Sequence, residues 1–227
     1  MRKRLVIAID GPAGTGKTTV ARRLAARLGY SYIESGAMYR ALALLALETH
    51  TDLNDAAALG RLAAKADMRF ETQGSANRLL LNGRDVTEAV RSPEVTRASS
   101  MVSVHAEVRK QLVERQRALG REGGVVMEGR DIGTRVFPGA GLKIFLDASP
   151  EVRSERRFQD LGGEGQVTQA EVLQELEERD RRDREREQSP LVPAEDSISI
   201  DTTHLTAEEV VERILGLVEG KLQDRNH

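Results

Sequence analysis

The chain has 227 residues, of which 39% are hydrophobic and 31% are charged, and its formal net charge at pH 7 is −2. This length fits one large domain or one domain with inserts, and the near-neutral charge argues against general binding to nucleic acid or to a membrane surface. Cysteine is absent, which excludes a disulfide framework, a thiolate metal site and a cysteine nucleophile. The apolar runs are too short for a secretion signal or a membrane span, so we expect a cytoplasmic protein.

The first part of the chain predicts strands and helices in alternation. RLVIAID is a short β-branched run that ends before Gly-Pro, which is typical of a buried parallel strand. The next segment has apolar residues at helical spacing, and Gly29 marks its end. The elements predicted here are strands at 4–10 and 30–35 and helices at 17–28, 37–48 and 56–66.

The pattern changes at residues 68–87, which read MRFETQGSANRLLLNGRDVT. Apolar and polar residues alternate in this segment, and Asn82-Gly83 is a strong hairpin-turn signal. We therefore predict short antiparallel strands, inserted into an otherwise β-α-β chain.

Helix-start signals recur in the second half of the chain. Ser92-Pro93-Glu94 combines a capping serine with proline at the first helical position, and residues 168–171 form a capping box. Further elements predicted here are strands in GGVVMEGRD, LKIFLDAS and DSISIDTT, and helices at about 105–121, in SPEVRSERRFQDL and in AEEVVERILGLVEGKL. Strands and helices that alternate over long connections favour a three-layer α/β fold with a central parallel sheet.

Residues 11–18 read GPAGTGKT and match G-x-x-x-x-G-K-[ST] between a predicted strand and a predicted helix. Glycines let the backbone wrap so that several N–H groups point at one anion, and the helix N-terminus adds its positive dipole end. Lys17 can reach the β- and γ-phosphates of a nucleotide, and the Thr18 hydroxyl can ligate Mg²⁺. The residues that we expect around ATP in this loop are Gly11, Pro12, Ala13, Gly14, Thr15, Gly16, Lys17, Thr18 and Thr19.

A phosphate-binding loop does not by itself separate a kinase from a GTP switch or an ATPase. The guanine-reading Asn-Lys-x-Asp of common switch GTPases does not occur in the sequence. The nearest acidic strand end is VVMEGRD, where Arg130 stands between the two acids. This arrangement suits the handling of an anion better than the simple holding of Mg²⁺.

Further arginines lie beside turn signals and predict a second phosphate site. Arg40 lies about one turn into a predicted helix that follows a strand, and Arg130 lies at a strand end, where open α/β sheets bind ligands. Arg109 lies in the long predicted helix. An acceptor that is itself a phosphate needs cations of its own, and it needs no general base because its second pKa is about 6.

Several motifs occur together and in order between residues 4 and 218: IDGPAGTGKTT, SGAMYR, EGRDIGT, KIFLDAS, ERDRRDRER and SPLVPAEDSISIDTT. Together they resemble the bacterial cytidylate kinase family. The resemblance implies a P-loop NTPase fold and transfer of the γ-phosphate of ATP to CMP or dCMP with Mg²⁺. It also implies a single domain with a core (1–61, 99–152 and 189–227), an antiparallel insert that binds the nucleoside monophosphate (about 62–98) and a helical lid (about 153–188).

The resemblance also implies roles for individual residues. Lys17, Arg130 and Arg179 are the implied catalytic residues, and Arg156 and Arg157 would lie near ATP. The implied substrate-binding residues are Ser35, Arg40, Ser100, Arg109, Arg130, Asp131, Arg179, Asp183 and Arg186. Among them Ser100, Arg109 and Asp131 would read the cytosine edge, and Asp183 would hold the ribose hydroxyls.

Residues 177–187 read EERDRRDRERE, with six acidic and five basic side chains. A disordered tail is disfavoured because a capping box begins the segment, and Val172, Leu173 and Leu176 give it one buried end. The apolar stripe stops after Leu176. The helix is then either solvated, with opposite charges paired at i,i+4, or it turns a polar face toward a ligand.

Spacing favours the second interpretation of this charged run. At roughly 100° per residue, Arg179, Asp183 and Arg186 fall within about 60° of one another on a helix. Such a face offers two cations to phosphates and one acid to ribose hydroxyls.

Two other classes of protein stay open at this point. One is a different small-metabolite P-loop kinase, such as a shikimate- or dephospho-coenzyme A-type enzyme, which would carry a base near its hydroxyl acceptor. The other is a regulatory protein that binds ATP without turnover. For the kinase that the motifs resemble, we expect ATP, CMP and dCMP as the partners, no nucleic acid, no membrane, and a monomer.

Overall fold

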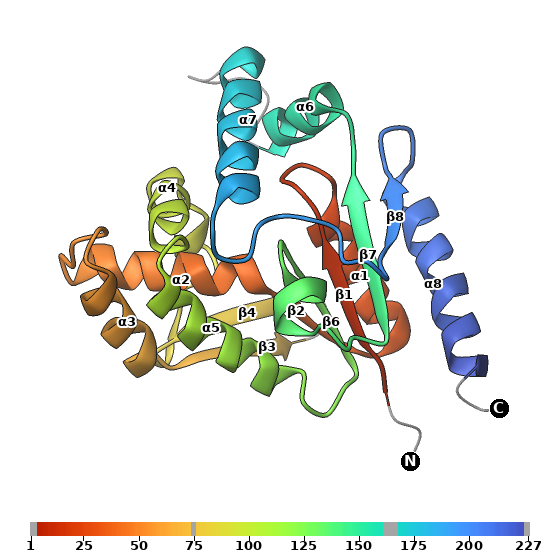
Figure 1. The fold of residues 1–227 in the computed structure, drawn as a ribbon, viewed down its shortest axis with the longest axis horizontal. Coiled ribbons are helices and arrows are strands. Elements are labelled where there is room, and N and C mark those ends of the chain that lie inside the picture. The colour runs from red at the N-terminus through yellow and green to blue at the C-terminus, as the bar shows by residue number, and fades with distance from the viewer. Residues whose placement is uncertain (1–3, 74–75, 161–167, 225–227) are drawn as a thin grey trace. The chain divides into compact units, whose positions relative to one another are not determined.

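The computed structural model describes residues 4–73, 76–160 and 168–224 (Figure 1). The chain forms two compact units. The first unit comprises Met1–Tyr30 and Gly123–His227, and the second unit comprises Ser31–Glu122. None of the helices in the described ranges is long and apolar enough to cross a membrane.

The first unit contains parallel strands in the order β6-β1-β7-β8. The side chains of β1, β6 and β7 are mostly β-branched or aliphatic and are buried, which explains why these strands read as continuous apolar runs. The register sets Asp10 opposite Gly129 on one side and Phe145 on the other, so the carboxyl ends of three strands meet at one edge. The strands are β1 (Val6–Asp10), β6 (Val125–Gly129), β7 (Leu142–Asp147) and β8 (Ile198–Asp201).

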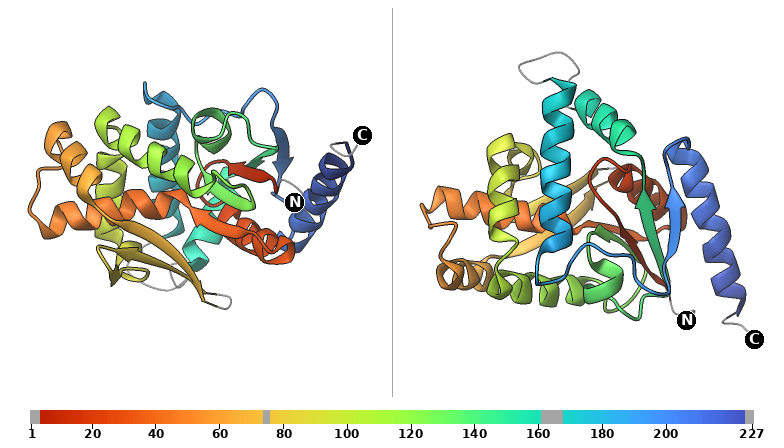
Figure 2. Two further views of the ribbon diagram at one scale, coloured as in Figure 1. Left: turned by 90° about the horizontal axis from the view of Figure 1, so that it is seen from below. Right: turned by 45° about the horizontal axis from the view of Figure 1, so that its top comes forward.

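In the described part of this unit, four α-helices and one π-helical turn accompany these strands. The helices are α1 (Lys17–Leu28), α6 (Pro150–Asp160), α7 (Gln169–Glu185) and α8 (Ala207–Asp224), and the turn η2 is Ile132–Val136. Helix α1 packs against β6 and α8. Helices α6 and α7 lie side by side beyond the carboxyl end of β7 (Figures 1 and 2). Helices α6 and α7 therefore lie on the side of the first unit where the parallel strands end.

The second unit is mainly helical and has a small antiparallel sheet in the order β3-β4-β5. Leu42, Leu59, Val102 and Leu112 are fully buried in its core. Its elements are β2 (Ser31–Glu34), α2 (Ser35–Glu48), α3 (Ala56–Lys65), β3 (Met68–Gln73), β4 (Ala76–Leu81), β5 (Arg84–Asp85), η1 (Ala89–Arg91), α4 (Pro93–Val102) and α5 (Ala106–Leu119).

The structure confirms the α/β class, the parallel strands and the antiparallel strands of residues 68–87. The predicted hairpin turn is present, with φ of 51° at Asn82 and 80° at Gly83. Ser92 caps α4 by accepting from the Val95 N–H, and Thr168 and Glu171 form the predicted capping box of α7. These signals were readable because each depends on a few neighbouring residues.

Two details differ from the sequence prediction. Helix α2 begins at Ser35, directly after β2, rather than at residue 37. The segment after Arg130-Asp131 forms the π-helical turn η2, for which the sequence offered no signal. The Asp131 carbonyl accepts from the Arg135 N–H at 2.8 Å and from the Val136 N–H at 3.2 Å.

Candidate active site

The predicted phosphate loop connects β1 to α1 in the first unit. Gly14 has φ of 78°, and a Cβ there would lie 2.7 Å from the Arg153 carbonyl oxygen, so only glycine fits this position. Gly16 caps α1 with φ of 85° and has no side chain to occupy the first N–H groups of the helix. The helix N-terminus is therefore available for an anion.

Lys17 begins α1 and is only 5% exposed. Its ammonium group donates to the Pro12 carbonyl and, at 3.3 Å, to the Thr15 hydroxyl. The pKa of Lys17 is lowered to about 7, mainly by burial and also by the positive charges of Arg130 and Arg179, against the opposing charges of Glu128 and Asp10. A bound anion would favour the ammonium form of Lys17, as expected of a site that receives a phosphate.

A carboxylate surrounded by arginines lies in the same unit. Asp183 of α7 accepts from Arg130 Nε at 2.9 Å and pairs with Arg186 Nη1 at 3.6 Å. Burial opposes ionisation of Asp183, but Arg130, Arg179 and Arg186 together lower its pKa below the ordinary value. The structure thus brings together four predicted residues, with Arg130, Arg179 and Arg186 around the carboxylate of Asp183.

Arg186 reaches this cluster by a route that helical spacing did not predict. Helix α7 ends at Glu185, and Arg186 is its C-cap with extended backbone (φ −62°, ψ 135°). Its Nε donates to the Ser189 carbonyl, and the Leu191 N–H donates to the Asp183 carbonyl at 2.7 Å. Hydrogen bonds of the chain that leaves the helix hold Arg186 beside Asp183, so Arg186 joins Asp183 from the C-cap of the helix and not from within it.

Asp10 connects β1 to the turn that carries Asp131. Its carboxylate accepts from the N–H groups of Ile132 and Gly133 at 2.8 and 2.7 Å. Burial raises the pKa of Asp10 to about 6, against the lowering effect of these two hydrogen bonds. Asp131 is 5% exposed at the start of this turn. Sequence reasoning missed Asp10, although its position at the end of a buried strand was a usable signal.

The predicted ATP-side arginines Arg156 and Arg157 lie on α6 and are half-buried. Arg156 donates to the Thr202 hydroxyl at 3.1 Å and to the Thr202 carbonyl at 2.7 Å. The Thr202 hydroxyl in turn donates to the Thr15 carbonyl at 3.1 Å. Arg156 is therefore linked to the phosphate loop through Thr202. A further arginine of this helix, Arg153, contacts the loop directly and was not predicted.

The second unit holds the other four predicted residues. Ser35 is buried at the first position of α2, and Arg40 of the same helix pairs with Glu34. The Arg109 guanidinium of α5 lies 5.5 Å from the centre of the Tyr39 ring and donates to the Ser103 carbonyl at 3.3 Å. Ser100 of α4 is half-buried.

No group of three or more His, Cys, Asp or Glu residues within the described ranges is arranged to hold a metal ion. The Thr18 side chain is exposed in the first turn of α1. One hydroxyl, completed by water and by ligand oxygens, is a donor set that suits a hard cation arriving with a phosphate. The residues present therefore fit a magnesium ion that a nucleotide brings, and they do not fit a metal held by protein side chains alone.

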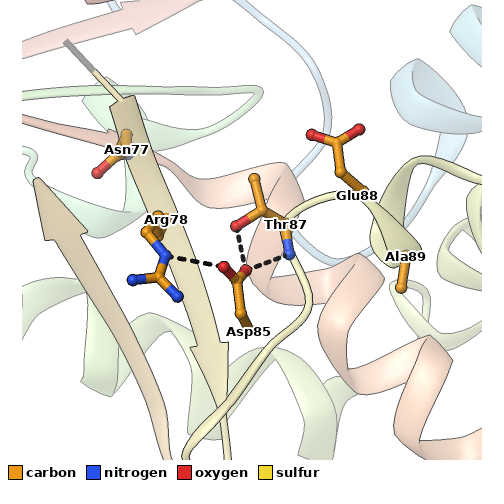
Figure 3. A pocket seen from close by; sticks show the side chains of 6 residues that line it. All are labelled: Asn77, Arg78, Asp85, Thr87, Glu88 and Ala89. Carbon is orange, nitrogen blue, oxygen red and sulfur yellow. Dashed lines mark hydrogen bonds and ion pairs between the residues drawn. The ribbon is translucent and has the colours of Figure 1, made fainter. Parts of the chain in front are cut away.

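The second unit also has an open pocket of about 460 Å³, lined by Asn77, Arg78, Asp85, Thr87, Glu88 and Ala89 (Figure 3). Asp85 accepts there from Arg78 Nε at 2.8 Å and from the Thr87 hydroxyl and N–H at 2.6 and 3.0 Å. None of the predicted site residues lines this pocket. Because Asp85 is already engaged by neighbouring groups and none of the predicted site residues lies here, we assign the pocket no catalytic role.

Comparisons with known proteins agree with this geometry. A family model described as cytidylate kinase matches residues 7–220. The chain is 48% identical over 224 residues to a cytidylate kinase of Desulfitobacterium hafniense (strain Y51), covering 98% of this chain and 96% of the relative. It is 50% identical over 225 residues to a bifunctional pantoate ligase/cytidylate kinase of Synechococcus sp. (strain JA-3-3Ab), covering 97% of this chain and 42% of that longer protein. The crystal structure of a gluconokinase from Sinorhizobium meliloti 1021 aligns over the whole of both chains with a TM-score of 0.54 and 16% identity, which shows a shared fold only.

Proposed function

The chain belongs to the cytidylate kinase family, and we propose that it transfers the γ-phosphate of ATP to CMP or dCMP, giving ADP and CDP or dCDP. The observation that carries this proposal is the environment of Lys17. It is a buried ammonium group whose pKa is lowered by burial and by the nearby arginines Arg130 and Arg179. Phosphate groups would relieve this accumulation of positive charge, and these cations would stabilise the negative charge that shifts onto the transferred group and the leaving oxygen in the transition state.

The proposed reaction needs no general base. An oxygen of the CMP phosphate attacks the γ-phosphorus, and the bond from that phosphorus to the β–γ bridging oxygen breaks, leaving ADP. The attacking phosphate is already ionised at pH 7 because its second pKa is about 6. Lys17 then stabilises charge on the leaving oxygen, and Arg130 and Arg179 stabilise the transferred group. Mg²⁺, carried with ATP and ligated by Thr18, would supply further charge neutralisation.

The remaining residues divide between the two nucleotides in this proposal. Residues 11–19 surround the ATP phosphates, while Arg156 and Arg157 lie on the ATP side. Ser35 and Arg40 bind the phosphate of CMP at the start of α2, where the helix N-terminus favours an anion. The residues proposed to hold the nucleoside of CMP are Ser100, Arg109, Asp131, Asp183 and Arg186.

Asp131 is the proposed source of base selectivity. Cytosine has an exocyclic amine that donates to a carboxylate, whereas uracil presents a carbonyl oxygen at the same place. A buried polar group left unpaired discriminates by about 10²-fold or more. We therefore expect CMP to be used well ahead of UMP.

The segments that resemble the insert and the lid keep those roles in the proposal. Residues 62–98 bind the nucleoside monophosphate, and α6 and α7 close over bound nucleotides as the lid. Lid closure excludes water, which would otherwise accept the phosphoryl group. We further infer a monomer that acts on free nucleotides in the cytoplasm and takes no nucleic acid.

A coupled ADP-release assay with CMP, dCMP, UMP, AMP and GMP tests the proposal. We expect turnover with CMP or dCMP, at least about 10²-fold lower kcat/KM with UMP, and a smaller gap in the Asp131→Ala protein. Equal use of CMP and UMP by the wild type would refute the role of Asp131. ATP binding without acceptor-dependent turnover would refute the kinase activity.

A further inference from the structure

We propose that Arg153 and Asp180 are positioning residues for phosphoryl transfer: their buried ion pair fixes α7, and with it Arg179 and Asp183, against the phosphate loop. The inference rests on the proposed function, because it assigns these two residues a task in the same reaction. All the elements involved belong to the first unit.

Arg153 joins three segments with one guanidinium group. Its Nη1 donates to the Ala13 carbonyl of the phosphate loop at 3.2 Å and also binds the Asp180 carboxylate. Its Nε donates to the Ala148 carbonyl at 3.2 Å. The Arg153 backbone lies against Gly14, where an added Cβ would come within 2.7 Å of the Arg153 carbonyl oxygen. Arg153 is 5% exposed, and a guanidinium group keeps its charge at any working pH.

Asp180 is the buried member of the charged run 177–187. It is 5% exposed, whereas its neighbours Arg181 and Arg182 are exposed. The buried residues of α7 are Val172, Leu176 and Asp180, spaced four apart. The buried stripe of this helix therefore does not stop at Leu176. It continues with the Asp180 carboxylate, which forms an ion pair with Arg153.

The rotation of α7 about its own axis decides where Arg179 and Asp183 point. On a helix Arg179 and Asp183 lie about 100° and about 60° from Asp180, both on the same side of it. A rotation of α7 about its axis would therefore displace both of them together. An ion pair at Asp180 resists such rotation, because its geometry is directional and one of its partners also holds the phosphate loop.

Packing alone would not require this ion pair. A leucine at position 180 would continue the apolar stripe, and a buried ion pair is often replaceable by apolar residues without loss of stability. Asp180 Oδ1 is buried and has no hydrogen-bond partner among residues 4–73, 76–160 and 168–224, so Arg153 is what holds this carboxylate. What the pair supplies and an apolar contact would not is a fixed link between Ala13 and α7.

The test compares Arg153→Lys and Asp180→Asn in the wild type and in a background that carries both Arg179→Ala and Asp183→Ala. Lysine keeps the charge but lacks the planar fork, and asparagine keeps the shape but lacks the charge. Each change should lower kcat/KM for CMP by about tenfold or more in the wild type, and by less than about twofold once Arg179 and Asp183 are both absent. Equal effects in both backgrounds would show that the pair does not act through α7, and would overturn the proposal.

A second variant separates positioning from folding. The double variant Arg153→Met/Asp180→Leu removes both charges together, so its melting temperature should stay at or above that of the wild type. We expect it nonetheless to lose about tenfold or more in kcat/KM. Wild-type kcat/KM in this folded double variant would overturn the proposal.

Matched controls lie on the exposed face of the same helix. Arg184→Lys and Glu177→Gln make the same kinds of change at exposed positions and should leave kcat/KM within about twofold of the wild type. Failure of this inference is distinguishable from failure of the proposed function. If the wild type lacks CMP turnover, the proposed function is wrong; if it turns over CMP but the Arg153 and Asp180 variants match it, only the positioning role is wrong.

Discussion

Binding of ATP to the nucleotide-free protein should take up close to one proton at pH 8. The pKa of Lys17 is lowered to about 7, first by burial and then by the charge of Arg130, so much of this side chain is neutral under mildly alkaline conditions. Bound phosphates stabilise the ammonium form and bring the pKa back toward its ordinary value. Binding therefore protonates Lys17.

The size of the effect follows from the two pKa values. With a pKa of about 7 before binding and well above 9 afterwards, the uptake should be about 0.9 proton at pH 8, about 0.5 at pH 7 and about 0.1 at pH 6. The uptake thus grows with pH. The γ-phosphate of ATP changes in the opposite way, because it still holds protons at pH 6 and is fully ionised at pH 8.

Calorimetry of ATP binding in buffers of different ionisation enthalpy measures the number of protons directly. Lys17→Arg is the matched control, because guanidinium does not titrate in this range and no uptake should remain. Uptake of the same size in Lys17→Arg would assign the proton to another group. Absence of uptake by the wild type at pH 8 would refute the description of Lys17 as a desolvated ammonium among cations.

Three further predictions follow from the site. Lys17→Ala should lower kcat by about 10³-fold in a folded protein, since Lys17 meets charge that grows in the transition state; near-normal turnover would contradict the phosphate-loop assignment. Arg179→Ala and Asp183→Ala should each lower kcat/KM for CMP by about tenfold or more, whereas Arg182→Ala and Glu187→Ala should change it little; equal small effects at all four would make the charged run a solvated surface. Because the pKa of Asp10 is raised to about 6, the folded protein binds this proton more readily than the unfolded chain, and stability from this group is lost as pH rises through 6. The wild-type free energy of unfolding, measured relative to that of Asp10→Asn by urea titration, should therefore increase by about 2 kcal/mol from pH 6.5 to pH 4.5, and a constant difference would refute the raised pKa.

The parts of the fold that were readable from sequence depend on local chemistry. The glycine spacing before Lys17, the Asn82-Gly83 turn and the capping box at Thr168 each specify a backbone geometry within a few residues, and the structure confirms all three. The alternation of strands and helices likewise indicated a parallel sheet. The strand order followed from long-range pairing that no local pattern encodes.

The charged run shows where sequence reasoning reached its limit. Helical spacing placed Arg179 and Asp183 correctly on α7 but carried the helix one residue too far, so Arg186 joins the cluster as a cap. The burial of Asp180 could not be predicted from the sequence, because a charged residue after Leu176 indicates that the buried face of the helix has ended. Only its buried partner, Arg153, 27 residues earlier, reveals that the stripe continues. The roles proposed for the site residues stay predictions.

Transfer of the terminal phosphate itself is the most direct test of the account. Wild-type protein is mixed with Mg²⁺, CMP and ATP labelled at the γ-phosphorus, and the products are separated by chromatography. We expect the label to appear in the β-phosphate of CDP at the rate at which ADP forms. Label released as inorganic phosphate at that same rate, with none in CDP, would contradict it.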